Sequence, residues 1–175
     1  MGWWQSVKQR RYALRRWMYR GGRPGRLARA ANRLSARQFS AGFLSPQRAV
    51  TLEIRGRRSG QVISLPLVVA DLAGERYLVS MLGNDASWVR NVRAAGGLAV
   101  LRRGGRHTVR LVEVEPGQRA PVLKRYLAVA PGARPHLPVD RHASLEEFER
   151  IADKYPVFRI TPASAADPHG ATPGT

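Results

Sequence analysis

Short apolar runs separated by turn-forming residues occupy the middle of the chain. Apolar runs of this length are typical of β-strands, and a glycine pair between two of them is typical of a hairpin turn. The pattern predicts strands over 48–55, 62–71, 76–82, 98–103 and 106–115, with a last strand over 157–160. Pro66 has no backbone N–H to donate, so it predicts a bulge or an edge in the second strand.

Helical periodicity occurs before, within and after this set of strands. Apolar positions three and four residues apart predict helices over 3–20, 26–39, 85–95, 116–130 and 144–153. Asp85 is positioned to cap the third helix, and Gly96-Gly97 to end it. Ser144 and Glu147 have the spacing of a capping box at the start of the last helix.

The strands do not alternate with helices in the regular way that a parallel sheet requires. We therefore predict a mainly β protein with helices (α+β), folded as a closed antiparallel barrel with N-terminal and peripheral helices. The expected organisation is a basic helical extension over 1–45, a barrel domain over 46–162 and a disordered tail over 163–175.

The chain carries a formal net charge of +18 over 175 residues. Most of its basic residues are arginines, and residues 1–58 contain a single acid, Glu53. Such an excess indicates an anionic partner, which is a nucleic acid, an anionic membrane or a polyanionic ligand. An arginine bias is also what a GC-rich genome produces, so the charge alone does not select among these partners.

The predicted helix over 3–20 has an apolar arc that includes Trp3 and Trp17 and is interrupted by Arg10 and Arg11. This pattern suits an anionic membrane surface, where tryptophans lie at the headgroup level and arginines reach phosphates. It equally suits a helix that packs on its own barrel or on the second protomer of a homodimer. With no cysteine and no apolar segment of signal-peptide or membrane-spanning length, we expect a cytoplasmic protein, either free or peripheral at the inner face of the membrane.

Familiar catalytic patterns are missing from the sequence. The four histidines, His107, His136, His142 and His169, lack metal-ligand spacing, and there is neither a nucleophile elbow nor a P-loop. If the protein is an enzyme, a cofactor must supply its reactivity. The best candidate for holding one is Gly56-Arg57-Arg58-Ser59-Gly60, because guanidinium groups, a hydroxyl and backbone amides between glycines form a donor-rich pocket for a phosphate.

The same stretch resembles a known family. The order G-R-[RK]-[ST]-G, a strand with an internal proline, a strand ending in glycine, then W-x-x-N and A-x-G/P-x-x-x-V is similar to that of the deazaflavin-dependent nitroreductase family. The resemblance covers residues 48–130 approximately. It implies a split β-barrel of the flavin-reductase type that transfers a hydride from reduced coenzyme F-420 to an unsaturated, quinone-like or nitro acceptor.

The resemblance also implies roles for individual residues. The phosphate of the coenzyme would be held by Arg57, Arg58, Ser59 and Gly60. The deazaflavin ring would contact Leu65 and Pro66, with its polar edge at the backbone of Met81, Leu82 and Gly83, under Trp88. Asn91 would anchor the phosphate-binding loop. Two of these residues have simpler interpretations, since Trp88 has the helical spacing of a core aromatic and Ser59 that of a turn residue.

Departures from the family pattern concern charge and substrate. Ile63 stands where many members have a further basic residue, and Met81 where small or hydroxyl residues are usual. Members that reduce nitroimidazoles have a tyrosine cluster after the long helix. Here the corresponding acceptor-binding candidates are Tyr126 and His136.

Two other functions fit the same sequence. Flavin mononucleotide, FMN, also ends in a phosphate that Arg57 and Arg58 would suit, so an FMN-binding split barrel is one alternative. A basic protein that binds nucleic acid or membrane without catalysis is the other. Specific nucleic-acid binding is not expected, because the aromatic residues are not interleaved with the basic ones along any strand.

Overall fold

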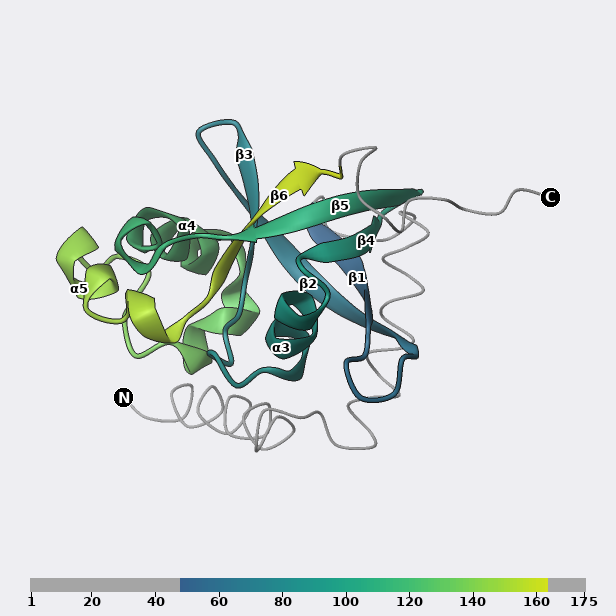
Figure 1. The fold of residues 1–175 in the computed structure, drawn as a ribbon. Coiled ribbons are helices and arrows are strands. Elements are labelled where there is room, and N and C mark those ends of the chain that lie inside the picture. The colour runs from purple at the N-terminus through teal and green to yellow at the C-terminus, as the bar shows by residue number, and fades with distance from the viewer. Residues whose placement is uncertain (1–47, 164–175) are drawn as a thin grey trace, which may run out of the picture.

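The protein is described here from a computed structural model, which describes residues 48–163 (Figure 1). The helices predicted over 3–20 and 26–39 and the tail from 164 onward lie outside the described residues, so these remain predictions. The described part contains an antiparallel barrel that is closed, in the order β1-β2-β3-β6-β5-β4. Its strands are β1 (Ala49–Arg55), β2 (Val62–Leu72), β3 (Glu75–Val79), β4 (Leu98–Arg102), β5 (Arg106–Glu113) and β6 (Val157–Pro162).

Pro66 lies at a strand edge and not at a bulge. The register between β1 and β2 runs without interruption from Ala49 opposite Val68 to Arg55 opposite Val62. The other side of β2 pairs with β3 only from Val69 onward. The missing N–H of Pro66 therefore falls where β2 has one partner strand within the described barrel, which is where a proline costs no ladder bond.

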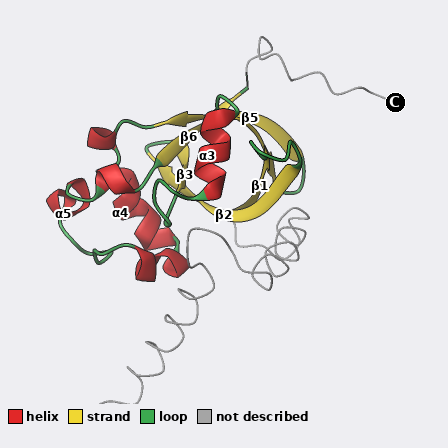
Figure 2. Ribbon diagram, turned by 60° about the horizontal axis from the view of Figure 1, so that its bottom comes forward, coloured by secondary structure: helices red, strands yellow, loops and turns green. Residues whose placement is uncertain are grey.

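The barrel interior is the main hydrophobic core. Every strand contributes apolar residues to it, and so does α3 (Ser87–Ala94), which lies across one end of the barrel (Figure 2). Trp88 of α3 is 8% exposed and packs at a tilt on Phe158 of β6, with 5.4 Å between the ring centroids. Such an aromatic pair adds directional packing to the area that it buries.

A second core lies outside the barrel, under a layer of helices. The layer consists of η2 (Pro116–Gln118), α4 (Ala120–Val129), η3 (Pro131–His136), α5 (Leu145–Glu149) and η4 (Ala152–Lys154). The predicted apolar stripe of the long helix is confirmed, because Val122, Leu123, Tyr126 and Leu127 are all buried in this core. The capping box of Ser144 and Glu147 is confirmed as well, with both of its hydrogen bonds present.

Three predicted details are wrong. Asp85 does not cap α3, because the helix begins one residue later than the cap requires; its N-cap is Ala86, and the Asp85 carboxylate pairs with Arg90. The segment after α4, where Pro131, Pro135 and Pro138 predict a stiffened loop, forms the 3-10 helix η3 instead. The helix expected to reach Asp153 ends at Glu149 because the chain tightens into η4.

Candidate functional site

The topology brings three of the predicted site segments to one end of the barrel. The turn over 56–60 joins the end of β1 to the start of β2, and residues 81–83 follow the end of β3. Because β1, β2 and β3 are antiparallel neighbours, the end of β1, the start of β2 and the end of β3 lie at the same end of the barrel. The helix α3 covers that end (Figures 1 and 2). Segments separated by some 30 residues of sequence are thus assembled around α3.

The turn over 56–60 is closed by its own backbone. The N–H of Gly60 donates to the carbonyl of Gly56 and the N–H of Gly56 to the carbonyl of Gln61, each at 2.8 Å. Gly60 has a φ of +66°, which an L-residue adopts only with strain. A Cβ on Gly56 would lie 2.8 Å from the Ser59 Oγ, so the turn is compact around this glycine.

Arg57 is docked onto α3 through Asn91. The Asn91 Oδ1 accepts from the Arg57 backbone N–H at 3.3 Å and from its guanidinium NH1 at 3.1 Å. Asn91 is 3% exposed, so the side chain that holds the turn is itself fixed in the core. The contact is that of an anchor for the loop, the role expected of Asn91. Arg57 is an exposed residue, and its guanidinium makes no other hydrogen bond within residues 48–163.

Arg58 and Ser59 form the exposed tip of the turn. Within residues 48–163 neither the Arg58 guanidinium nor the backbone N–H groups of Arg58 and Ser59 have a hydrogen-bond partner. The Ser59 Oγ accepts weakly from the Gln61 N–H at 3.3 Å, which is the turn role considered for it, and its own hydroxyl proton remains available. The tip therefore presents several hydrogen-bond donors, as an anion site requires.

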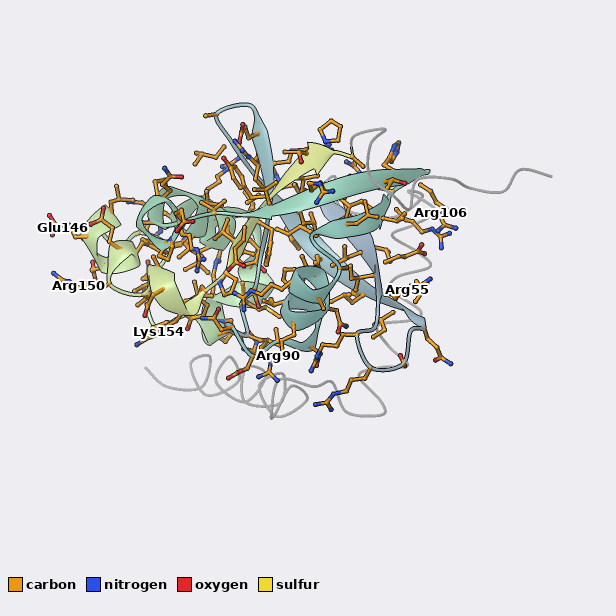
Figure 3. The ribbon with its side chains drawn as sticks, in the orientation of Figure 1. Arg55, Arg90, Arg106, Glu146, Arg150 and Lys154 are labelled. Carbon is orange, nitrogen blue, oxygen red and sulfur yellow. The ribbon has the colours of Figure 1, made fainter. Side chains whose placement is uncertain are left out.

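Arg55 is a basic residue of this region that the sequence reasoning missed. It ends β1 directly before the turn and is exposed (Figure 3). Its guanidinium contacts no carboxylate in the described part of the chain. The signal was present in the sequence, since Arg55 directly precedes Gly56.

The segment over 81–83 is held by Ser80. The Ser80 Oγ donates to the Gly83 carbonyl at 2.8 Å, and the Gly83 N–H donates to the Ser80 carbonyl at 3.1 Å. Gly83 thus has both backbone groups occupied. The N–H groups of Met81 and Leu82 have no partner among the described residues, so both are unused hydrogen-bond donors at this end of the barrel.

Leu65 and Pro66 do not offer side chains to a common surface. Leu65 packs against the barrel core, and the next residue of a strand points to the opposite face. Their contact with one ring stays a prediction, with at most one of the two side chains on any one face of the strand. The alternation of side chains on a strand, which the resemblance did not take into account, is the physical reason.

The remaining predicted residues are dispersed. Trp88 belongs to the barrel core, as its simpler interpretation stated, and its proposed part in closing a pocket stays a prediction. Tyr126 is 4% exposed in the helical-layer core, where burial raises the pKa of its hydroxyl. His136 lines a surface hollow of about 410 Å³ together with Tyr155, whose hydroxyl donates to the His136 carbonyl at 3.0 Å. The structure does not bring Tyr126 into the lining of that hollow.

A charged network fixes α3 against the barrel. Glu113 at the end of β5 accepts from the Arg93 guanidinium at 2.7 and 2.8 Å and from Arg119 at 3.1 Å. The Arg93 hydrogen bonds hold the pKa of Glu113 below its ordinary value, and burial lowers the pKa of Arg119. Because Arg93 is two positions from Asn91 on α3, this network helps to set the position of the anchor.

Among the described residues, no group of three or more histidine, aspartate and glutamate side chains could hold a metal ion. No described helix has both the length and the apolar character needed to cross a membrane.

A closed, six-stranded antiparallel barrel with a helix across one end and further helices beside it is a split β-barrel of the flavin-reductase type. Comparison with solved structures agrees with this class. The chain is similar to the conserved hypothetical protein Rv2991 from Mycobacterium tuberculosis, with a TM-score of 0.50 and 18% identity over 77% of this chain and 90% of that protein. It is also similar to Atu2129, a protein of unknown function from Agrobacterium tumefaciens strain C58, with a TM-score of 0.51 and 15% identity over 78% of this chain and 59% of that protein.

An F-420-H2-dependent reductase called FDR-A also matches, with a TM-score of 0.45 and 21% identity over 65% of this chain and 94% of that protein. No protein-family model and no curated protein matches the sequence. At these identities the comparisons establish the fold, and the function has to be inferred from the site.

Proposed function

We propose that the protein is an oxidoreductase that binds reduced coenzyme F-420 at the α3 end of the barrel. It would transfer a hydride from this coenzyme to an unsaturated, quinone-like or nitro acceptor. The observation that carries the proposal is the assembly of the donor-rich turn, the two unpartnered N–H groups of Met81 and Leu82, and α3 at that end. These are the segments that the family resemblance assigns to one coenzyme.

The residues present fit a ligand with a phosphate and a polar ring edge. Arg57 is held by Asn91 and so is oriented before any ligand arrives, which lowers the entropy lost on binding. Arg58, Ser59 and Arg55 add exposed donors beside it. Guanidinium groups suit phosphate because their planar fork matches two of its oxygens. The oligoglutamate tail of the coenzyme would add further negative charge for the same basic surface.

When bound, the reduced coenzyme supplies a hydride, which is two electrons with one proton. The part of the chain is then to bind, to orient and to exclude water, and no acid or base of the protein is obligatory. An acceptor reduced by this hydride would also need one proton, which solvent would supply.

The test is a comparison of two ligands on the full-length protein. Coenzyme F-420 and FMN would be titrated separately at one salt concentration, with binding followed by fluorescence. We expect tighter binding of coenzyme F-420, and a two-electron reduction of a quinone acceptor when the reduced coenzyme is supplied. Tighter binding of FMN would transfer the proposal to the flavin, while binding of neither would overturn it.

A further inference from the structure

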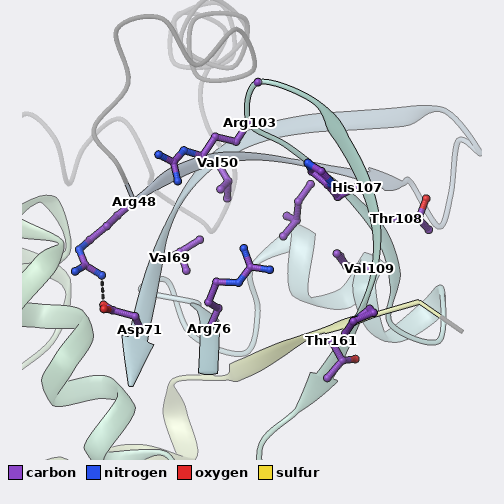
Figure 4. Close-up of a pocket in the computed structure, with 13 residues that line it drawn as sticks. Arg48, Val50, Val69, Asp71, Arg76, Arg103, His107, Thr108, Val109 and Thr161 are labelled. Atoms are coloured by element: carbon purple, nitrogen blue, oxygen red, sulfur yellow. Dashed lines mark hydrogen bonds and ion pairs between the residues drawn. The ribbon is translucent and has the colours of Figure 1, made fainter. Parts of the chain in front are cut away.

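The barrel end opposite α3 contains a cavity of about 710 Å³ (Figure 4). This volume falls in the range of roughly 300 to 1,000 Å³ that is usual for small-molecule sites. The cavity is lined by the start of β1, β3 and β5 and by the ends of β2, β4 and β6. Trp88, Val89 and Val92 of α3 fill the other end of the same core, so the barrel interior separates this cavity from the turn over 56–60.

The floor of the cavity is apolar. Each of the six strands places one buried apolar residue in the adjoining layer of the core, namely Val50, Val69, Leu78, Leu101, Val109 and Ile160. Four of them line the cavity directly: Val50, Val69, Leu101 and Val109. A floor of this kind favours a ligand that covers it with apolar surface.

The rim of the cavity differs sharply from its floor. Side chains two positions apart on a strand share a face, so the next inward-facing position lies two residues nearer the opening. Applied to the six strands, this spacing selects Arg48, Asp71, Arg76, Arg103, His107 and Pro162, all of which line the cavity. Two residues nearer the opening along each strand, the barrel lining thus changes from wholly apolar to mainly basic.

Not all of this charge is available to a ligand. Asp71 pairs with Arg48, as the dashed line in Figure 4 marks, and with Arg125 at 3.0 Å. The single carboxylate of the rim is thereby occupied by two guanidinium groups. Arg76 and Arg103 are exposed and have no side-chain partner within residues 48–163. Figure 4 shows Arg76 reaching into the opening, with Arg103 and His107 at its border.

We propose that this cavity binds an amphiphilic organic anion, an aliphatic chain that ends in a carboxylate. The chain would cover the four apolar side chains of the floor, and the carboxylate would accept hydrogen bonds from Arg76 and Arg103 at the rim. A small inorganic anion would leave the floor uncovered, and an uncharged alkyl chain would leave both arginines unused. The site is separate from the one proposed for coenzyme F-420 and does not depend on it.

The first test uses the wild-type, full-length protein. Octanoate, decanoate and dodecanoate would be titrated by calorimetry below their micelle concentrations, with 1-decanol as the uncharged comparison. Burying a methylene is worth about 0.8 kcal/mol, so affinity should rise about ten-fold for each two methylenes until the floor is covered. Decanol should bind more weakly than decanoate. Absence of dodecanoate binding, or an affinity that does not change with chain length, would overturn the proposal.

The second test assigns the binding to the rim. Arg76→Ala and Arg103→Ala should each weaken dodecanoate binding about three- to ten-fold, because these groups are partly solvated. Arg150→Ala is the matched control, since Arg150 is an exposed arginine of the helical layer, far from the cavity (Figure 3). Equal losses in Arg150→Ala and Arg76→Ala would mean a diffuse charge effect and would overturn the proposal. Arg57→Ala should leave dodecanoate affinity unchanged, and a loss there would refute the separation of the two sites.

Discussion

Asn91 on α3 holds Arg57 in the β1–β2 turn, 34 positions earlier in the chain, through two hydrogen bonds to one oxygen. One bond comes from the Arg57 backbone at 3.3 Å and the other from its guanidinium at 3.1 Å. The buried amide therefore fixes the path of the turn and the direction of an arginine together. Any ligand of the turn is coupled through this contact to the packing of α3.

Loss of this anchor should affect folding and binding together. Asn91→Ala should lower the free energy of unfolding by about 1 to 2 kcal/mol, because two hydrogen bonds are lost from a buried position. It should also weaken coenzyme F-420 binding, because Arg57 loses its fixed direction. Urea unfolding and coenzyme titration measure the two effects. Ser87→Ala, on the first turn of the same helix, is the control and should change neither the unfolding free energy nor the coenzyme affinity. If Asn91→Ala also changes neither, the Asn91–Arg57 contact contributes to neither folding nor binding.

Arg57 and Arg58 should separate stability from binding. The Arg58 guanidinium has no partner in the described chain, so Arg58→Ala should weaken coenzyme binding about ten-fold with an unchanged melting temperature. Arg57→Ala should weaken coenzyme binding and also lower the melting temperature, because Arg57 is bonded to Asn91. From the sequence alone, we would expect neither arginine to contribute to stability. Arg58→Lys should recover part of the affinity, because lysine keeps the charge without the fork. A loss in Arg58→Ala no larger than in Arg150→Ala would argue against a phosphate contact.

Glu113 should contribute stability that depends on pH. Hydrogen bonds from Arg93 hold its pKa below the ordinary value of 4.5. A carboxyl with a lowered folded pKa contributes fully above its unfolded pKa, and the contribution disappears as pH falls through the folded value. Glu113→Gln should therefore lower the free energy of unfolding by about 1 to 2 kcal/mol at pH 7. This figure already includes a reduction for solvent screening, because Arg93 is partly exposed.

The difference in unfolding free energy between wild type and Glu113→Gln should shrink below pH 4.5 and vanish below the lowered pKa. Urea titrations at several pH values between 3 and 7 would follow it. Glu146→Gln, at an exposed glutamate of α5, supplies the comparison and should show no such trend. A difference that stays constant with pH would mean that the effect of Glu113→Gln is not ionic.

Two glycines with positive φ should respond differently to alanine. A Cβ on Gly97, at φ +83°, would lie 2.5 Å from the Leu111 carbonyl oxygen, whereas a Cβ on Gly60, at φ +66°, meets nothing within 4 Å. Gly60→Ala should cost about 1 kcal/mol for the left-handed backbone alone. Gly97→Ala should cost about 3 kcal/mol or more, since β5 must also move. Equal losses of unfolding free energy would contradict the close contact.

Much of the architecture follows from local patterns. The runs that predicted six strands, the glycines that end α3 and the Ser144–Glu147 capping box all depend on residues near one another in sequence, and all are confirmed. The errors concern where helices begin and end and whether the proline-rich segment is helical. Asp85 has the right chemistry for a cap, but Arg90 takes its carboxylate and the helix begins at Ser87.

The candidate site divides in the same way. The sequence identified the donor-rich turn because glycine, arginine and serine express their chemistry locally. It could not tell that Leu65 packs inward while Pro66 faces away, nor that Tyr126 is enclosed by the helical layer. Those facts depend on which face of each element meets another.

By itself, the sequence determined the six strands, the closed antiparallel class of barrel, the basic character of the chain and the position of the donor-rich turn. These are consequences of periodicity, turn chemistry and charge, which act over a few residues. Only the tertiary structure decided that Asn91 meets Arg57, that α3 fills one end of the barrel, and that Arg76 and Arg103 border an apolar cavity at the other. The reason is strand register, which decides which residues of the six strands face inward side by side. No local sequence pattern relates these strands to one another.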